Sequence, residues 1–87
     1  MTGETKSGFV YTLDDDILDD MELLDAMAEA GDTIASPSKF VLKVLGKKQR
    51  KALYDHIRDD KGKVRPERVM DEIKEMFEGL GKAGKNY

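Results

Sequence analysis

The sequence contains no cysteine, no tryptophan and only two prolines among its 87 residues. Without cysteine there is no disulfide framework, no thiolate zinc site and no cysteine nucleophile, and a reducing cytosolic compartment is permitted. Histidine is almost as scarce. His56, the single one, has no second histidine to share a metal ion and no serine in a nucleophile turn near it. We therefore interpret His56 as a surface or boundary residue.

Long apolar runs are missing as well. Residues 1–13 lack the basic region and apolar run of a signal peptide, and no window approaches the roughly 18 to 20 apolar residues of a membrane span. The sequence therefore predicts a soluble, cytoplasmic protein that does not contact membranes. A chain of this length predicts a single domain over residues 1–87, whose one small core removes only about 60% of the unfolded surface from water.

No loop has the spacing of a phosphate or calcium site. Gly46-Lys47 and Gly81-Lys82 lack the glycine spacing and the strand context of a phosphate loop. If Gly62 were the sixth residue of a calcium loop, the first would be Ile57 and the twelfth Arg68, and neither suits the ion. We expect no catalytic, cofactor-binding or metal-binding residues, and a protein that is not an enzyme.

Charge is abundant and unevenly distributed. The chain carries 18 acids and 15 bases, a net charge of −3, but residues 1–36 hold ten of the acids and one lysine. Residues 37–87 hold eight acids and fourteen bases. The two parts can neutralise each other within the fold, or each can bind a partner of opposite charge. The sequence leaves both arrangements open.

Residues 14–30 combine this acidic charge with a helical apolar period. The stripe consists of Ile17, Leu18, Met21, Leu24, Met27 and Ala28. Acids at 14–16 suit a helix N-terminus, and Gly31 supplies a stop. The pattern predicts a helix over residues 15–30 with the stripe in the core.

Three further helices are predicted downstream. Ser36 and Pro37 form a helix start, Gly46 a break, and Pro66 the first position of another helix. The predicted fold is therefore an all-α, small four-helix domain with helices near 15–30, 37–45, 47–58 and 66–79. Its expected core is Ile17, Met21, Leu24, Phe40, Val44, Leu53, Ile57, Val69, Ile73 and Phe77.

The predicted helical core, residues 14–79, lies between less regular ends. Residues 1–8 read as a disordered lead and residues 80–87 as a flexible tail. Residues 9–13 read as a short extended N-terminal arm, because Phe9, Tyr11 and Leu13 alternate. The arm either packs on the helices through Phe9 and Leu13 or adds to a strand of another subunit.

Two charged segments are candidate binding surfaces. Asp15, Asp19, Glu22 and Asp25 lie between the apolar positions of the first helix, and are either a solvated face or a docking surface for a basic partner. Residues 39–68 hold eleven bases and four acids, and Tyr54 offers a ring for base stacking, so a small nucleic-acid-binding adaptor is the alternative. The negative net charge and the lack of a nucleic-acid-binding motif disfavour it.

Several short segments resemble one family. They are Asp19-Asp20-Met21-Glu22-Leu23-Leu24, Val44-Leu45-Gly46, Tyr54-Asp55-His56-Ile57-Arg58-Asp59, Gly62-Lys63-Val64 and Lys85-Asn86. Together they span most of residues 9–87, and the chain resembles the tail assembly chaperones of long-tailed, siphovirus-type bacteriophages and prophages of Gram-positive bacteria. It departs from them at Met21, where that acidic stretch has a tryptophan, and at Lys47-Lys48, where the family tends to be acidic.

The resemblance implies a non-enzymatic protein, absent from the finished virion, that acts in the host cytoplasm. Its implied partners are the tape measure protein and the major tail tube protein, which it helps to assemble around the tape measure. It also implies a longer product made by ribosomal frameshifting near the end of the reading frame. Oligomeric state and self-association stay open.

Overall fold

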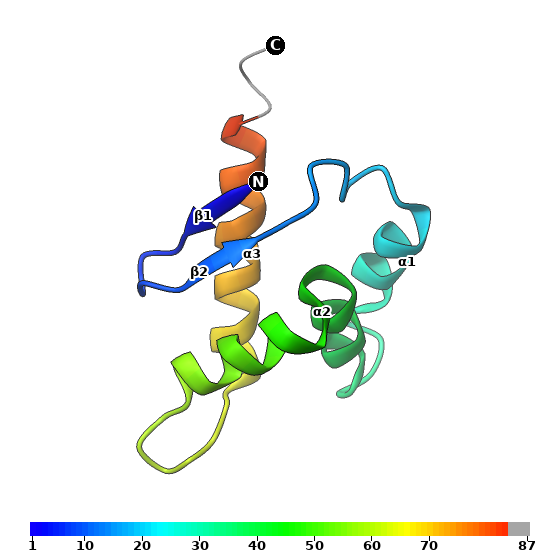
Figure 1. Cartoon of the computed structure of the whole chain (residues 1–87). Coiled ribbons are helices and arrows are strands. Elements are labelled where there is room, and N and C mark those ends of the chain that lie inside the picture. The colour runs from blue at the N-terminus through cyan, green and yellow to red at the C-terminus, as the bar shows by residue number, and fades with distance from the viewer. Residues whose placement is uncertain (84–87) are drawn as a thin grey trace.

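The computed structural model describes residues 1–83, with side chains described up to Leu80 (Figure 1). It contains strands β1 (Thr2–Glu4) and β2 (Val10–Thr12) and helices α1 (Met21–Glu29), α2 (Ser36–Ile57) and α3 (Pro66–Ala83). The two strands form one antiparallel sheet. The prediction of an all-α, four-helix domain is therefore wrong, and the described part of the chain has a small mixed fold.

The hairpin accounts for most of the difference. β1 pairs with β2 in the register Thr2 to Thr12, Gly3 to Tyr11 and Glu4 to Val10. Residues 1–8, expected to be disordered, therefore supply a strand and a turn. The arm over residues 9–13 pairs within its own chain, which satisfies backbone groups that would otherwise be buried unpaired. Its alternation is confirmed, because Phe9, Tyr11 and Leu13 are all buried.

The outer edge of β2 is closed by a glutamine side chain. Thr12 N–H donates to Gln49 Oε1 at 2.7 Å, and Gln49 Nε2 donates to the carbonyl of Thr12 at 2.8 Å. One amide thus makes both of the hydrogen bonds that a neighbouring strand would make at this residue. At Thr12, β2 is consequently protected against pairing with a strand of another molecule.

Helix α2 contains a sharp break at Gly46, whose backbone has φ 76° and ψ 169°. Positive φ suits glycine, which has no Cβ to clash in this region. The predicted helices 37–45 and 47–58 correspond to the two halves of α2 on either side of this break. Ser36, predicted as an N-cap, is the first residue of α2 instead, and its hydroxyl accepts a hydrogen bond from Thr33 N–H at 3.1 Å.

Helix α3 begins at Pro66 as predicted, and continues to Ala83. Its extra turn includes residues 80–83, which were expected to belong to the tail. Residues 84–87, also assigned to that tail, lie outside the described residues. β1 and the hairpin turn lie against α3, and Lys6 N–H donates to the carboxylate of Glu75 there.

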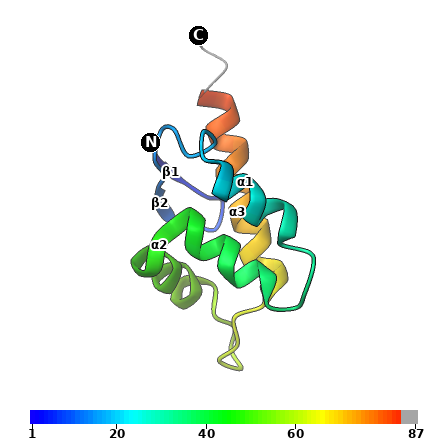
Figure 2. The same ribbon diagram turned by 90° about the vertical axis from the view of Figure 1, so that its right-hand side faces the viewer.

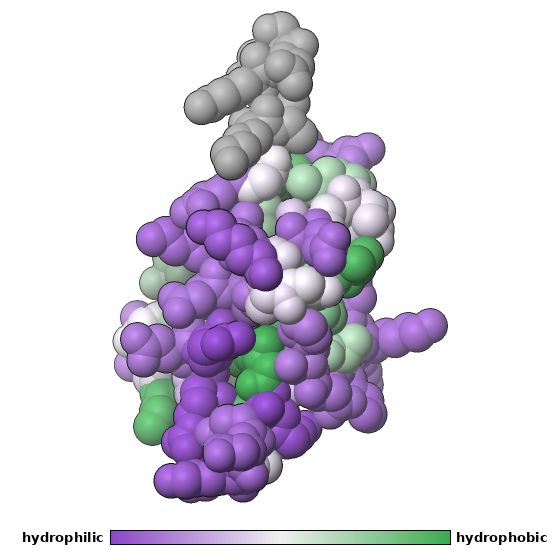
Figure 3. Space-filling model, turned by 90° about the vertical axis from the view of Figure 1, so that its left-hand side faces the viewer, coloured by the Kyte–Doolittle hydropathy of each residue, from purple (hydrophilic) through white to green (hydrophobic). Residues whose placement is uncertain are grey.

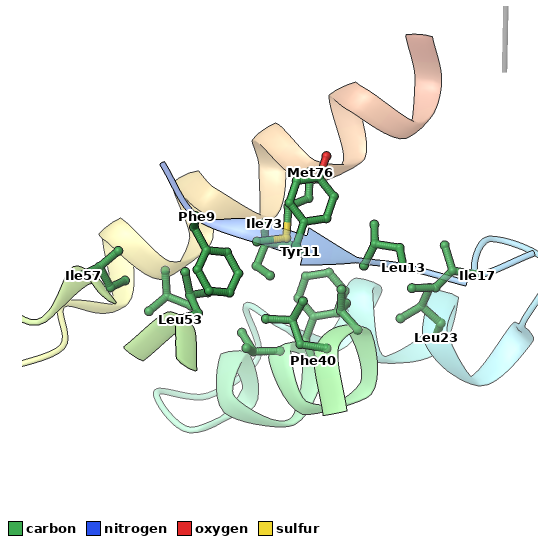
Figure 4. Packing of buried hydrophobic residues seen from close by; sticks show 14 residues of the cluster. Phe9, Tyr11, Leu13, Ile17, Leu23, Phe40, Leu53, Ile57, Ile73 and Met76 are labelled. Atoms are coloured by element: carbon green, nitrogen blue, oxygen red, sulfur yellow. The ribbon is translucent and has the colours of Figure 1, made fainter. Parts of the chain in front are cut away.

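The core lies between the hairpin and the helices, where side chains from β2, α2 and α3 converge (Figure 4). Seven of the ten predicted core residues are buried: Ile17, Phe40, Val44, Leu53, Ile57, Val69 and Ile73. Phe77 is partly buried against the same cluster, whereas Met21 and Leu24 are exposed. The core also contains Phe9, Tyr11, Leu13, Leu23, Val41, Leu45 and Met76.

Two glycines make room for the Tyr11 side chain. A Cβ added to Gly3 would lie 2.5 Å from the Tyr11 hydroxyl oxygen, and one added to Gly79 would lie 2.9 Å from it. The hydroxyl therefore occupies the gap between β1 and α3 that the two glycines leave. Burial, together with the nearby charge of Glu75, raises the pKa of Tyr11.

The substitution Gly79→Ala tests this packing. Alanine normally stabilises a helix by about 1 kcal/mol relative to glycine. Here we expect the new methyl group to meet the Tyr11 hydroxyl and cancel that gain. In a Tyr11→Phe background, where the hydroxyl is gone, Gly79→Ala should recover it. Urea unfolding of the four proteins measures both effects, and an equal effect of Gly79→Ala in the two backgrounds would contradict the packing.

Candidate partner-binding surface

Helix α1 begins later than predicted because Asp20 caps it. Asp20 has an extended backbone, and its carboxylate accepts hydrogen bonds from the N–H groups of Glu22 at 2.9 Å and Leu23 at 3.4 Å. The preceding residues form turns, in which the carbonyls of Asp14 and Asp16 accept from residues three positions later. The prediction that the helix starts at 15 and is capped by residues 14–16 is therefore wrong.

The later start changes which side of α1 is buried. Leu23 is only 1% exposed, and Ala26 and Ala30 pack against the core beside it. Met21 is 69% exposed, Leu24 39% and Met27 37%. Of the apolar stripe that was predicted to fill the core, Ile17 is buried, whereas Leu18, Met21, Leu24 and Met27 are exposed.

We call the exposed apolar side of this helix, formed by Met21, Leu24 and Met27, the α1 face. Helix α1 itself lies at one side of the molecule, away from the hairpin (Figures 1 and 2). Leu18, in the turn before the helix, is a further exposed apolar side chain at 48%. Exposed apolar groups that recur along one side of a helix are a usual feature of protein-binding surfaces.

The four acids predicted to bind a partner are all exposed, but the structure separates them. Asp15 accepts a hydrogen bond from the amino group of Met1 at 2.9 Å, so it has a partner within the chain. Asp19 and Glu22 line a surface groove of about 430 Å³ next to α1. Asp25 lies one turn further along the helix and is not part of the groove lining.

The groove beside α1 combines acidic and apolar groups. Asp14, Asp16, Asp19, Asp20 and Glu22 contribute carboxylates, and Ile17, Met21, Leu23 and Val44 contribute apolar surface. Lys43 is the cation of the lining, with its Nζ 4.0 Å from a Glu22 carboxylate oxygen. Such a surface favours binding of a partner that presents an apolar side chain flanked by Lys or Arg.

Over residues 1–83, no group of His, Asp or Glu side chains is arranged to hold a metal ion.

A second polar cluster lies at the hairpin turn, on a face covered mainly by hydrophilic side chains (Figure 3). The Ser7 hydroxyl donates to Glu72 Oε1 at 2.8 Å and lies 3.1 Å from His56 Nε2. His56 Nε2 is also 3.0 Å from the carbonyl oxygen of Ser7. A carbonyl can only accept, so this nitrogen carries a proton and donates.

The contacts of this cluster differ from those of a Ser-His-acid triad. A protonated Nε2 cannot remove the hydroxyl proton of Ser7, and the carboxylate of Glu72 contacts the serine rather than the other nitrogen of the histidine. The Thr5 hydroxyl also donates to Glu72 Oε1, at 2.8 Å. Glu72 is 5% exposed, so these two hydroxyls satisfy a buried carboxylate and hold the turn on α3.

Sequence reasoning placed His56 at the surface but missed its partners. Ser7 lies 49 residues from His56 and 65 from Glu72. One signal was present in the sequence: Glu72 falls on the same helical line as Val69 and Met76, so it is a charged residue within an apolar stripe. A carboxylate in that position requires hydrogen-bond donors from another segment.

The positive charge of residues 39–68 is partly neutralised by ion pairs within the fold. Asp55 pairs with Lys51 at 2.9 Å and with Arg58 at 3.0 Å, and Asp59 pairs with Arg65 at 2.8 Å. Hydrogen bonds from Lys51 and Arg58 lower the pKa of Asp55. The pKa of Asp59 is lowered by the backbone N–H of Lys63, and then by the side chain of Arg65.

Tyr54, the candidate for base stacking, is only partly accessible. It is half-buried against the core, and the guanidinium of Arg50 lies 6.0 Å from the centre of its ring. Lys47 and Lys48 are exposed on the second half of α2. The basic charge and the aromatic ring therefore do not form an open stacking surface.

Comparisons of the chain with protein-family models, with curated proteins and with solved structures give no match. The described helices are too short or too polar to cross a membrane. Over the described residues, Met21, Leu24 and Met27 are exposed large apolar side chains that share one helix.

The start of α1 is tested by Asp20→Ala. Loss of an N-cap side chain typically costs about 1 kcal/mol, so we expect lower stability and a lower helical signal in circular dichroism. Asp16→Ala is the matched control, because the side chain of Asp16 does not cap α1. If Asp16→Ala is the more damaging change, the helix begins upstream, as the sequence had predicted.

Proposed function

We propose that this protein is a non-enzymatic chaperone or adaptor that binds an amphipathic helix of a partner protein. The observation that carries this proposal is the exposure of Met21, Leu24 and Met27 on one side of a short helix. An amphipathic surface helix normally turns its apolar stripe toward its own core. Here only Leu23, Ala26 and Ala30 of this helix pack against the core. The exposed Met21, Leu24 and Met27 can therefore bind another molecule.

Two of the three side chains in the α1 face are methionines. Methionine is unbranched and polarisable, so it adapts to differently shaped neighbours. A surface of this kind suits a binding protein that covers successive, non-identical helical segments of a long partner. This agrees with the tape measure protein that the resemblance to tail assembly chaperones implies.

The charge around the α1 face specifies the partner further. Asp19, Glu22, Asp25 and Glu29 flank the apolar stripe, and Lys43 is the cation that approaches one of them. The complementary partner is a helix with an apolar stripe bordered by Lys or Arg. Binding would mask that stripe in the host cytoplasm until the tail tube protein replaces the chaperone. No cofactor and no chemical step are required.

The nucleic-acid-binding alternative rests on residues 39–68, and within them on Lys47, Lys48, Arg50 and Lys51, of which Lys51 pairs with Asp55. Its support is weaker, because Asp55 and Asp59 pair with neighbouring bases and Tyr54 is half-buried against the core. It predicts binding that falls steeply as the salt concentration rises and that depends on these four bases.

Capture experiments with two variants test the proposal. The tagged protein is expressed with the products of its neighbouring genes, treated with nuclease and recovered. We expect a long helical protein or a tube-forming protein in the wild-type sample. Met21→Ser with Leu24→Ser should lower its recovery roughly tenfold or more, because exposed anchor side chains dominate such interfaces. Asp19→Lys with Glu22→Lys and Asp25→Lys should do the same.

Asp15 is left unchanged in the charge-reversal variant because it binds the terminal amino group. Val10→Ser is the matched control, since Val10 is 61% exposed on the hairpin, away from α1. Circular dichroism checks that each variant stays folded. Undiminished capture by both α1 variants would refute the proposal. Loss of the captured material on nuclease treatment, or with Lys47→Glu and Lys48→Glu, would favour the nucleic-acid alternative.

A further inference from the structure

A second apolar surface lies where the two halves of α2 meet the start of α3. Val41, Tyr54, Val64 and Val69 line a small groove of about 170 Å³, and Ile34 stands at its edge. Ile34 belongs to the loop between α1 and α2 and is fully exposed. We call this surface the Ile34 groove.

The Ile34 groove has a cation at its rim. Arg50 donates to the hydroxyl of Ser38 at 3.4 Å, and its guanidinium lies 6.0 Å from the centre of the Tyr54 ring. Both Ser38 and Tyr54 line the groove. Within residues 1–83, Arg50 has no salt bridge to a carboxylate, so its charge is available to a bound molecule.

The α1 face and the Ile34 groove are complementary in chemistry. The first presents Met21, Leu24 and Met27 between carboxylates, and the second presents an apolar pocket beside an uncompensated guanidinium. Both are surfaces of the same molecule. Leu23 is buried where α1 packs on α2 of the same chain, and Met21, Leu24 and Met27 are exposed to solvent.

We propose that the protein self-associates head to tail, with the α1 face of one copy seated in the Ile34 groove of the next. A two-fold pairing of α1 with α1 is disfavoured, because it would bring the flanking carboxylates of both copies together. Contact between two different surfaces leaves one of each free on the end copies, so it builds open chains unless the rotation between copies closes a ring.

This proposal deepens the proposed function. It rests on that function only in stating that a partner helix competes with the next copy for the α1 face. The same α1 face would serve the next copy in the free protein and a basic partner helix during assembly. The partner should therefore shorten the chains, and self-association should reduce the affinity for the partner by mass action.

Sedimentation velocity of the purified full chain, without any partner, tests the contact. We expect the average mass to rise with protein concentration up to about 1 mM, and to fall at high salt because screening weakens the charge pairing. A groove variant, Ile34→Ser with Arg50→Gln, and a face variant, Met21→Ser with Leu24→Ser, should each weaken association roughly tenfold or more. Val10→Ser should leave it unchanged.

A mixture of the groove variant and the face variant tests whether the two surfaces bind each other. The groove variant keeps an intact α1 face and the face variant keeps an intact groove, so together they should form a one-to-one pair that grows no further. The proposal is overturned if the wild-type protein stays monomeric or if neither variant weakens its association. It is also overturned if Val10→Ser weakens association or if the mixture forms no pairs. Val10→Ser and Ile34→Ser change exposed side chains, and melting curves check that the double variants fold.

The outcome is separable from that of the capture experiment. The groove variant should still capture the partner, because its α1 face is unaltered. Self-association without capture would contradict the proposed function and support the head-to-tail contact. Capture without self-association would support the proposed function and contradict the head-to-tail contact.

Discussion

The buried side of the hairpin determines how the three helices of this small chain pack. Phe9, Tyr11 and Leu13 are all buried, with Phe9 and Tyr11 toward α2 and α3 and Leu13 toward Leu23 of α1 (Figure 4). An 87-residue domain has a single core of limited volume, which these three large side chains help to fill. Helix α1 then needs to contribute only Leu23 and small neighbours. Its remaining apolar side chains are consequently available for binding.

Polar contacts hold the hairpin where this packing requires it. Gln49 completes the hydrogen bonding of β2 at Thr12, and the hydroxyls of Thr5 and Ser7 satisfy the buried carboxylate of Glu72. A two-stranded hairpin is marginal by itself in water, so these contacts with α2 and α3 stabilise it. They also explain why a glutamine and a glutamate occupy positions that the helical pattern assigns to the core side.

The sequence predicted the elements whose signals are local. The break at Gly46, the start of α3 at Pro66 and the alternation in β2 follow from backbone preferences and periodicity. β1 was missed because its residues are polar and its pairing uses backbone groups. The outward stripe of α1 was missed because periodicity identifies an apolar side without saying whether it meets its own core or another molecule. The partners of Glu72 lie too far away in the sequence to be found by spacing.

Solvent exposure of single methionine methyl groups would show whether the apolar side of α1 faces water. With methyl-labelled methionines and a soluble paramagnetic agent, NMR line broadening at low protein concentration reports which methyl groups meet water. The account predicts strong broadening for Met21 and Met27 and protection of Met76, which is fully buried. Equal protection of all three would mean that α1 packs with its stripe inward, and the binding surface proposed for this protein would not exist.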